Sequence, residues 1–442
     1  MPTSDQISQA RAMIERWFLR GVEAVDPAIA VRRALDFDEV VNILTVNGAA
    51  IPVQGDVVLI ALGKAAVPMA AAAAAILGDR LTSGVVITKD GHATDQLPEH
   101  VDLFEASHPI PDQRGVHATS IAIDRVSGLG PDDVVLALIS GGGSALFEAP
   151  VPPLTLADIA ATTDALLRAG APIQDLNAVR IPLSQVKGGG FRAAAPDATF
   201  ATLILSDVLS NDVRTIASGP TVPATANAEA ALEVLRRYGV ASSVPPAVLT
   251  VLQNISTPEH RAHPNDLIAV IADNAAALAG IRSAALADGM HVEQVWHKRE
   301  GEAAELGRAW VAACRGADPS VDVLLGGGEA TVTVRGSGSG GRNTEFALAA
   351  AIDLAENHDE WVVASLATDG QDALTGAAGA SADPLTVLRA EVAGIEPRAA
   401  LRDNDSLAVF DAAGGTVITG PTGTNVNDCY IAVRCSSIGG IR

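Results

Sequence analysis

The stretch VVLALISGGGS, residues 134–144, decides the fold class of this chain. Its first six residues, Val134–Ile139, are all apolar, which is typical of a strand in a parallel sheet covered by helices on both faces. The glycines that follow predict a sharp turn from the strand into a helix. Such a turn lies at the carboxyl edge of the sheet, where α/β proteins bind their ligands.

The same pattern recurs along the chain and predicts an α/β fold. Apolar runs at Val57–Leu62 and Trp361–Ala367 predict further buried strands, each followed by a polar turn. We therefore expect two Rossmann-like, three-layer α/β domains with mainly parallel sheets and an interdomain cleft. The polar segment 256–265, with its prolines, predicts the linker. It divides the chain into an N-terminal domain of residues 1–255 and a C-terminal domain of residues 256–442.

Composition and charge exclude several classes of protein. The 442 residues carry 52 acidic and 30 basic side chains, a formal net charge of −22. Nucleic-acid binding needs the opposite sign. The 3 cysteines lack the spacing of a disulfide framework or a zinc site. The apolar runs are too short to span a bilayer, and the first residues are not those of a signal peptide. We expect a cytoplasmic protein with no membrane partner, and a homodimer stays open.

Two turns in the first half suit phosphate binding. Lys64 follows a strand at a point where a helix begins and where exposed N–H groups favour an anion; a solvated lysine is the alternative. The three glycines between Ser140 and Ser144 let the backbone approach a phosphate and direct several N–H groups towards it. A plain tight turn would use the same glycines.

Acidic residues follow the next predicted strand, Thr199–Leu205. Asp207 and Asp212 lie on one loop and could hold Mg²⁺ or accept a proton. An aspartate in this position is also a common helix cap. His108, in Ser107-His108-Pro109, could act as a base, but we favour a structural role in the turn.

A glycine pattern in the second half has two interpretations. GSGSGG, residues 336–341, fits the G-x-G-x-x-G fingerprint of a dinucleotide-binding turn. A single match of this kind is weak, and Arg342 follows the last glycine directly. Its guanidinium group offers a fork of donors that suits a phosphoryl group. An exposed arginine is the alternative.

Three polar turns in the second half, at 368–372, 404–406 and 420–428, suit a hydroxylated acid or a magnesium ion. They offer hydroxyl, amide and carboxylate groups. Ordinary turns use the same residue types.

Together these motifs resemble those of the type II glycerate 2-kinases, whose C-terminal half is called the MOFRL domain. The resemblance spans nearly the whole chain. It rests on GKAA at Gly63, SHPIPD at Ser107, LISGGGSALF at Leu138, IASGPTVP at Ile216, GGRNTEFALAA at Gly340, ATDG at Ala367 and TGPTGTNVND at Thr419.

The resemblance implies an active site between two Rossmann-like domains and transfer of the γ-phosphoryl group of ATP to the 2-hydroxyl of D-glycerate, with ATP and Mg²⁺ as cofactors. Lys64 and Arg342 match the family's catalytic lysine and arginine. This agrees with the cationic neutralisation on which phosphoryl transfer relies. Asp207 is our candidate for orienting or deprotonating the hydroxyl.

The remaining candidate site residues form three sets. For the nucleotide they are Ser140, Gly141, Gly142, Gly143, Ser144, Gly338, Gly340, Gly341, Asn343 and Glu345. For the substrate they are Asp212, Asp369, Asp372, Asn404, Thr422 and Asn425. For Mg²⁺ they are Asp207 and Asp369.

Three segments depart from the family's pattern and predict a changed acceptor. Ile181-Pro182 stands where the family usually has Lys-His. LSND at 209–212 replaces the usual Pro-Gly-Asp-Asp, and DALTG at 372–376 replaces Asp-Gly-Pro-Thr-Asp. A pocket that has lost a cation and an imidazole is less suited to a small carboxylate.

Two other functions stay open. An NAD(P)H-dependent hydroxypyruvate reductase would need an acidic residue about 20 positions after the fingerprint to hold the ribose. Asp359-Glu360 is near that spacing but abuts the next predicted strand. The third possibility is a catalytically impaired relative that acts as a ligand sensor. The retained Lys64 and Arg342 argue against it, and the three departures argue for it. In each case we expect a small-molecule partner and no nucleic acid.

Overall fold

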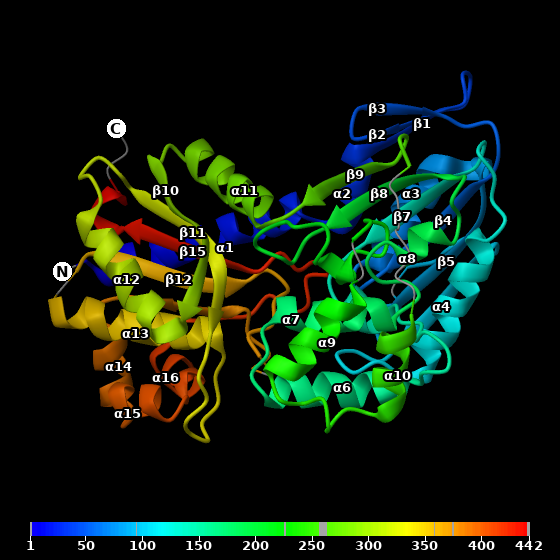
Figure 1. The fold of residues 1–442 in the computed structure, drawn as a ribbon. Coiled ribbons are helices and arrows are strands. Elements are labelled where there is room, and N and C mark those ends of the chain that lie inside the picture. Colours follow the sequence, from blue (N-terminus) through cyan, green and yellow to red (C-terminus); the bar gives the residue numbers. More distant parts are fainter. Residues whose placement is uncertain are drawn as a thin grey trace. The chain divides into compact units, whose positions relative to one another are not determined.

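The computed structural model describes residues 2–93, 95–224, 227–255, 263–357, 359–373 and 375–439. The chain divides into two compact units, whose elements are labelled in Figure 1. We call Pro27–Ile271 the N-terminal unit. The C-terminal unit combines Met1–Asp26 with Ala272–Arg442.

The N-terminal unit is built on a six-stranded sheet. Its strand order is β6-β5-β4-β7-β8-β9. The strands are β4 (Val57–Leu62), β5 (Leu81–Lys89), β6 (Val101–Ala106), β7 (Val134–Ile139), β8 (Thr199–Leu205) and β9 (Leu267–Ala272). The pairs β6–β5, β5–β4, β4–β7 and β7–β8 are all parallel. Leu62 at the end of β4 lies opposite Ile139 at the end of β7, so the turns after these strands are neighbours.

Helices cover both faces of this sheet, because its central strands are apolar on both sides. Every residue of β4 and of β7 is buried. Val58, Ile60 and Leu62 share a core with helix α4 (Gln113–Val126). Their neighbours along β4 point the other way, towards the face that helix α3 (Ala66–Leu77) contacts. The parallel α/β architecture predicted for this half is confirmed.

The rest of the N-terminal unit surrounds the sheet. A three-stranded antiparallel sheet comprises β1 (Leu35–Asp38), β2 (Ile43–Val46) and β3 (Ala49–Pro52). The other helices are α2 (Pro27–Ala34), α5 (Gly143–Leu146), α6 (Leu156–Arg168), α7 (Ile173–Arg180), α8 (Gly190–Ala193), α9 (Ala228–Arg237) and α10 (Pro246–Asn254). Of these, α6, α7, α9 and α10 contribute to a separate apolar core.

The C-terminal unit has a mixed sheet, where we predicted a mainly parallel one. Its order is β10-β11-β15-β12-β13-β14, with β10 (Val292–Glu302), β11 (Val323–Thr331), β12 (Trp361–Ala367), β13 (Gly379–Ala382), β14 (Thr416–Val417) and β15 (Asp428–Arg434). Only β10 and β11 pair in parallel; the other four pairings are antiparallel. The reason is β15, which runs antiparallel between β11 and β12. A continuous apolar run predicts burial on both faces but not the direction of the strand.

Helix α1 (Ser4–Ala24) belongs to the C-terminal unit, unlike in the predicted division at residue 255 (Figure 1). It contacts β12, β15 and helix α11 (Asn274–Ala287). The two helices approach closely at glycines: a Cβ on Gly21 would lie 2.6 Å from Ile281, and one on Gly280 would lie 2.6 Å from Ala24. The division also differs at the other end, because β9 is part of the N-terminal sheet. Most of the predicted linker, residues 256–262, lies outside the described residues.

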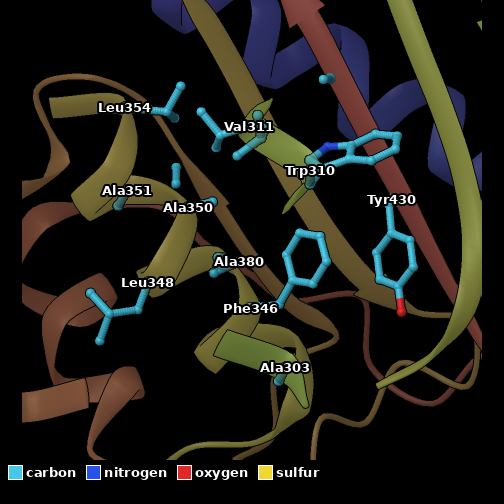
Figure 2. Close-up of a cluster of buried hydrophobic side chains, with 14 of the residues drawn as sticks. Ala303, Trp310, Val311, Phe346, Leu348, Ala350, Ala351, Leu354, Ala380 and Tyr430 are labelled. Carbon is cyan, nitrogen blue, oxygen red and sulfur yellow. The ribbon is translucent and has the colours of Figure 1, made fainter. Parts of the chain in front are cut away.

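Helices α12 (Ala303–Gly316) and α13 (Arg342–Asn357) supply the main core of the C-terminal unit (Figure 2). Phe346 of α13 stacks on Tyr430 of β15, with ring centroids 4.6 Å apart. Trp310 of α12 packs against the same tyrosine. This aromatic contact fixes the start of α13 beside the start of β15. The remaining helices are α14 (Thr386–Val392), α15 (Pro397–Arg402) and α16 (Ser406–Ala413). None of the described helices is long and apolar enough to cross a membrane.

Candidate functional site

In the N-terminal unit, the turns after β4, β7 and β8 bring three predicted residues together. The backbone N–H of Lys64 donates to the carbonyl of Gly141 at 2.9 Å. A Cβ on Gly141 would lie 2.1 Å from Oδ2 of Asp207, and one on Gly142 would lie 3.3 Å from Cγ of Lys64. The glycines are therefore needed for this close approach. Lys64, the glycine turn and Asp207 form one cluster, as the parallel strand order predicts.

The glycine turn offers open backbone donors. Within the described residues, no group accepts a hydrogen bond from the N–H groups of Gly141, Gly142, Gly143 or Ser144. Gly142 adopts a left-handed conformation, with φ of 86°, which a residue with a side chain rarely adopts. The turn can therefore present several donors to an anion.

Ser140 has a structural role rather than the predicted nucleotide contact. Its side chain is buried, 1% exposed. The hydroxyl accepts a hydrogen bond from the N–H of Ala65 at 3.0 Å and donates to the carbonyl of Leu62 at 3.3 Å. It thus ties the turn after β7 to the turn after β4.

Burial shifts the pKa values of two titratable groups next to Lys64. It raises the pKa of Asp207, and Lys64 opposes that effect. Burial, reinforced by Lys64, lowers the pKa of His108 to about 4, so this imidazole is neutral near pH 7. A Cβ on Gly142 would lie 3.2 Å from Nε2 of His108. His108 was predicted to have a structural role in a turn; it lies beside Lys64 and Gly142 and so belongs to the candidate site.

Asp212, a predicted substrate residue, lies further along the loop after β8. Its carboxylate pairs with the exposed Arg214 at 3.0 Å and accepts that residue's backbone N–H at 3.1 Å. These are contacts within one loop, and a role in binding substrate stays a prediction.

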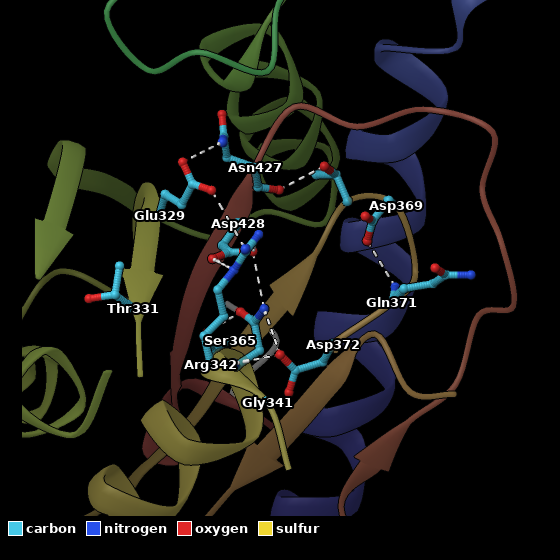
Figure 3. Close-up of polar contacts among 12 residues, drawn as sticks. Glu329, Thr331, Gly341, Arg342, Ser365, Asp369, Gln371, Asp372, Asn427 and Asp428 are labelled. Atoms are coloured by element: carbon cyan, nitrogen blue, oxygen red, sulfur yellow. Dashed lines mark hydrogen bonds and ion pairs between the residues drawn. The ribbon is translucent and has the colours of Figure 1, made fainter. Parts of the chain in front are cut away.

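In the C-terminal unit, the site centres on Arg342, the first residue of α13 (Figure 3). Its Nε and Nη2 donate to the two carboxylate oxygens of Asp428 at 2.7 and 3.0 Å. Asn343 also donates to Asp428, at 3.1 Å. The Arg342 side chain is 32% exposed, and its Nη1 lies 3.6 Å from Glu329. One edge of the guanidinium group is therefore fixed while the side chain still reaches solvent.

Asp428, the partner of Arg342, was not among the predicted site residues. It is completely buried. Burial raises its pKa, whereas Arg342 and Asn343 lower it. Burial would lower the pKa of Arg342, but Asp428 and Glu329 outweigh burial and raise it. The available signal was its position at the end of the motif TGPTGTNVND.

Asp372 stabilises the start of α13 rather than facing a substrate. Its carboxylate accepts hydrogen bonds from the N–H of Asn343 at 2.9 Å, the N–H of Thr344 at 2.8 Å and the hydroxyl of Thr344 at 2.8 Å. The side chain is 1% exposed. A Cβ on Gly341 would lie 2.3 Å from this carboxylate, which explains that glycine. The contacts favour helix capping over the predicted substrate role.

The turn 336–341 differs from the predicted phosphate cradle, because the loop 403–405 accepts hydrogen bonds from most of its N–H groups. Asn404 accepts from the N–H of Arg335 at 2.7 Å and of Gly336 at 3.0 Å. The carboxylate of Asp403 accepts from Ser337 at 3.1 Å, its carbonyl accepts from Gly338 at 2.9 Å, and the carboxylate of Asp405 accepts from Ser339 at 2.9 Å. The loop 403–405 thus lies where an anion would bind.

This packing also accounts for the predicted nucleotide residues nearby. A Cβ on Gly338 would lie 2.3 Å from Asp405, and one on Gly340 would lie 2.2 Å from Ser406. Glu345 accepts a hydrogen bond from Asn404 at 2.8 Å, and burial raises its pKa. The glycine fingerprint is therefore explained by contacts inside the unit.

The last predicted residues lie on the polar turns near Arg342. Asp369 is partly exposed, accepts the N–H of Gln371 at 2.9 Å and contributes to the raised pKa of Arg342. The Thr422 hydroxyl donates to the Thr368 carbonyl at 2.6 Å, and Asn425 accepts the N–H of Asn427 at 3.1 Å. Thr422 thus ties its turn to the turn after β12, Asn425 stabilises its own turn, and Asp369 remains partly exposed.

No group of three or more His, Cys, Asp or Glu side chains able to hold a metal occurs among the described residues. Asp207 and Asp369, the predicted Mg²⁺ ligands, belong to different units. Their joint role stays a prediction.

Comparisons with known proteins cover most of the chain. A family described as a domain of unknown function (DUF4147) matches residues 13–253, and the MOFRL family matches residues 322–428. A D-glycerate 2-kinase of Thermotoga maritima is 40% identical over 386 residues, which is 85% of this chain and 90% of the relative. A putative hydroxypyruvate reductase of Agrobacterium vitis is 40% identical over 428 residues, 95% of this chain and 93% of the relative. The crystal structure of a glycerate kinase from Thermotoga maritima matches with a TM-score of 0.86 at 35% identity, covering 97% of this chain and 100% of that chain.

Proposed function

This chain belongs to the glycerate kinase family, and we propose that it uses ATP and Mg²⁺ to phosphorylate the 2-hydroxyl of D-glycerate or of a closely related small hydroxy acid. The observation that carries the proposal is the cluster at the edge of the N-terminal sheet. There Lys64 lies beside four open backbone donors, from Gly141 to Ser144, and beside the buried Asp207.

Lys64 and the glycine turn supply what phosphoryl transfer needs most. The transferred group carries negative charge on its oxygens, and catalysis relies on fixed positive charge and on positioning. A lysine next to several N–H groups provides both. We assign Lys64 and the turn to the transferred phosphoryl group.

Asp207 is our candidate for the group that orients the hydroxyl or removes its proton. Its raised pKa brings it closer to the working pH than that of an ordinary aspartate. A general base works best when its pKa lies near that pH. Lys64 keeps the ionised form accessible.

Arg342 is our second catalytic cation. Asp428 fixes the orientation of its guanidinium group through two hydrogen bonds. The side chain therefore loses little conformational freedom when an anion binds. The partly exposed side chain has donors left for a phosphoryl oxygen.

Asp207 and Asp369 would hold the magnesium ion, since Mg²⁺ prefers carboxylate oxygens together with the phosphates of its nucleotide. A bound Mg²⁺ would neutralise phosphate charge. A cation near Asp207 would also favour its ionised form, which burial alone disfavours. We further propose a cytoplasmic location, because Cys314, Cys429 and Cys435 are all free and buried.

An assay with ATP, Mg²⁺ and a panel of small hydroxy acids tests the proposal. We expect ADP formation with D-glycerate or a close relative. Lys64→Ala and Arg342→Ala should each lower kcat at least about 100-fold. Lys298→Ala, at an exposed lysine, is the control and should leave the rate unchanged.

The same assay separates the competing functions. NADPH oxidation with hydroxypyruvate, in the absence of ADP formation, would replace the kinase by a reductase. The occupied donors of the turn 336–341 argue against that outcome. Nucleotide binding without turnover of any acid would indicate a ligand sensor.

A further inference from the structure

A buried charged cluster lies beside the glycine turn of the N-terminal unit, outside the residues assigned so far. We call the two cations Arg180 and Lys187, together with the carboxylate of Glu148, the cation cluster. Nζ of Lys187 lies 3.1 Å from Oε2 of Glu148 and donates to the carbonyl of Ser144 at 2.8 Å. Nη2 of Arg180 donates to the same carbonyl at 3.2 Å. Ser144 therefore links the cation cluster to the glycine turn.

The cation cluster carries one more positive than negative charge. Glu148 is the one carboxylate, within the described part of the chain, that supports the charge of Arg180 or Lys187. Burial lowers the pKa of both cations, and Arg180 further lowers that of Lys187. This local excess of positive charge contrasts with the net charge of −22 of the whole chain. A bound anion would balance it.

Arg180 has hydrogen-bond donors to spare. The bond to Ser144 is its one hydrogen bond to described residues, and its Nε is buried without an acceptor. Asn177, one helical turn earlier on α7, likewise has a buried Oδ1 without a partner. Buried polar atoms are normally paired, so Arg180 and Asn177 each have room for a further hydrogen-bond partner. A guanidinium group recognises a carboxylate best, through two parallel hydrogen bonds.

The side chains of Lys187 and Ile181 already make contacts within the protein. Lys187 is 1% exposed and is held by Glu148 and Ser144. Ile181 packs against Gly188, where a Cβ would lie 2.6 Å from it. The departure at Ile181 therefore concerns packing, and Arg180 remains the cation with a partly exposed side chain.

Arg180 is hydrogen-bonded to the same glycine turn that approaches Lys64. Gly142 approaches Lys64, and Ser144, two residues later, holds Arg180. Two residues span at most about 7 Å. An anion bound to Arg180 would therefore lie beside the glycine turn that approaches Lys64. The hydroxyl of Ser144, which hydrogen-bonds Ser218 at 2.8 Å, lies on the same stretch.

We propose that Arg180 binds the carboxylate of the acceptor and so makes this site specific for 2-hydroxy acids. The inference rests on the proposed kinase function and names the residue that selects its substrate class. Lys187 and Glu148 act as positioning residues, because Lys187, paired with Glu148, donates to the Ser144 carbonyl to which Arg180 is bonded.

Steady-state kinetics of Arg180→Gln and Arg180→Lys test the assignment. We expect Arg180→Gln to raise KM for D-glycerate about 10- to 100-fold, the worth of hydrogen bonds to a charged group. KM for ATP should stay within about threefold. The wild-type enzyme should prefer D-glycerate over the uncharged glyceramide, and Arg180→Gln should lose that preference. Arg180→Lys should fall between them, because lysine keeps the charge but not the fork.

Arg168→Gln, at an arginine whose side chain is 80% exposed, is the matched control and should match the wild type in both KM values. Melting temperatures of all variants check folding; if Arg180→Gln fails to fold, Arg180→Lys still reports on the acid preference. Unchanged KM and preference in the folded Arg180 variants would overturn the inference and leave the kinase standing.

Calorimetric titration separates this inference from the kinase proposal. If the wild-type protein forms no ADP with any acid, the kinase proposal fails, and binding of D-glycerate and glyceramide is measured directly. Binding of the acid to the wild type that is lost in Arg180→Gln supports the assignment. Equal binding to both proteins, or no binding to the wild type, overturns it.

Discussion

Arg342 and Asp428 are joined by two hydrogen bonds, of 2.7 and 3.0 Å, between the first residue of α13 and the first residue of β15. The pair lies next to the aromatic contact between Phe346 and Tyr430. The orientation of the guanidinium group is therefore determined by the packing of a helix on a strand. Catalytic groups held in this way lose little freedom when substrate binds.

Asp428→Asn should lower kcat about 10- to 100-fold, because an amide can accept only one of the two hydrogen bonds and removes the opposing charge. Steady-state rates at saturating ATP give the measurement. Glu329→Gln is the control, since Glu329 is 44% exposed and lies 3.6 Å from Arg342; its kcat should change less than about threefold. A wild-type kcat in Asp428→Asn would show that Arg342 needs no fixed orientation.

Gly141→Ala should abolish activity and lower the melting temperature, because its Cβ would lie 2.1 Å from the Asp207 carboxylate. Either the turn or Asp207 must move. Gly316→Ala, where a Cβ meets nothing within 4 Å, should leave activity and melting temperature unchanged or slightly improve stability. Normal activity of Gly141→Ala would contradict the close approach of the two turns.

Asp372→Ala should lower the free energy of unfolding by about 2 kcal/mol, the cost of a lost helix cap and of unpaired buried donors. Urea denaturation measures it. Asp369→Ala should have little effect on stability, because Asp369 is partly exposed. If Asp372 were a substrate residue instead, its replacement would raise KM for the acceptor without this loss of stability.

The lowered pKa of His108 predicts a loss of stability in mild acid. The folded protein holds this pKa at about 4, while the unfolded chain has about 6.5. Between these values the unfolded state binds more protons, so stability falls as the pH drops from 7 towards 4. From pH 7 to 5 the loss should be on the order of 1 kcal/mol, allowing for solvent around a half-buried group.

His108→Gln should remove that part of the pH dependence. Urea midpoints of wild type and variant at pH 7 and pH 5 make the comparison. Parallel losses in the two proteins would rule out the neutral imidazole beside Lys64.

Much of the N-terminal unit was predictable, because its parallel strands are buried on both faces and end at polar turns. The bounds predicted for β4 and β8 match the structure, and the clustering of Lys64, Gly141 and Asp207 follows from the strand order. The direction of β15 was not predictable, since an apolar run has the same pattern in either direction.

The site residues of the C-terminal unit were harder to predict for a chemical reason. Asp372, Asn404 and Asp428 use the same carboxylate and amide groups for capping, for filling a turn and for holding an arginine. Residue type alone does not separate these uses from ligand binding. Glycines are equally ambiguous: those of 141–143 leave donors open, whereas those of 336–341 make room for neighbouring carboxylates.

The placement of α1 means that the N-terminal unit is an insertion within the C-terminal one. The chain begins one structure, leaves it after Asp26 to build another, and returns near Ala272. A shortened chain starting at residue 272 would lack Trp17 and Phe18, both fully buried in the intact unit. It should expose an apolar surface that is prone to aggregation. Residues 27–271, by contrast, form an uninterrupted segment that could be exchanged between relatives as a single cassette.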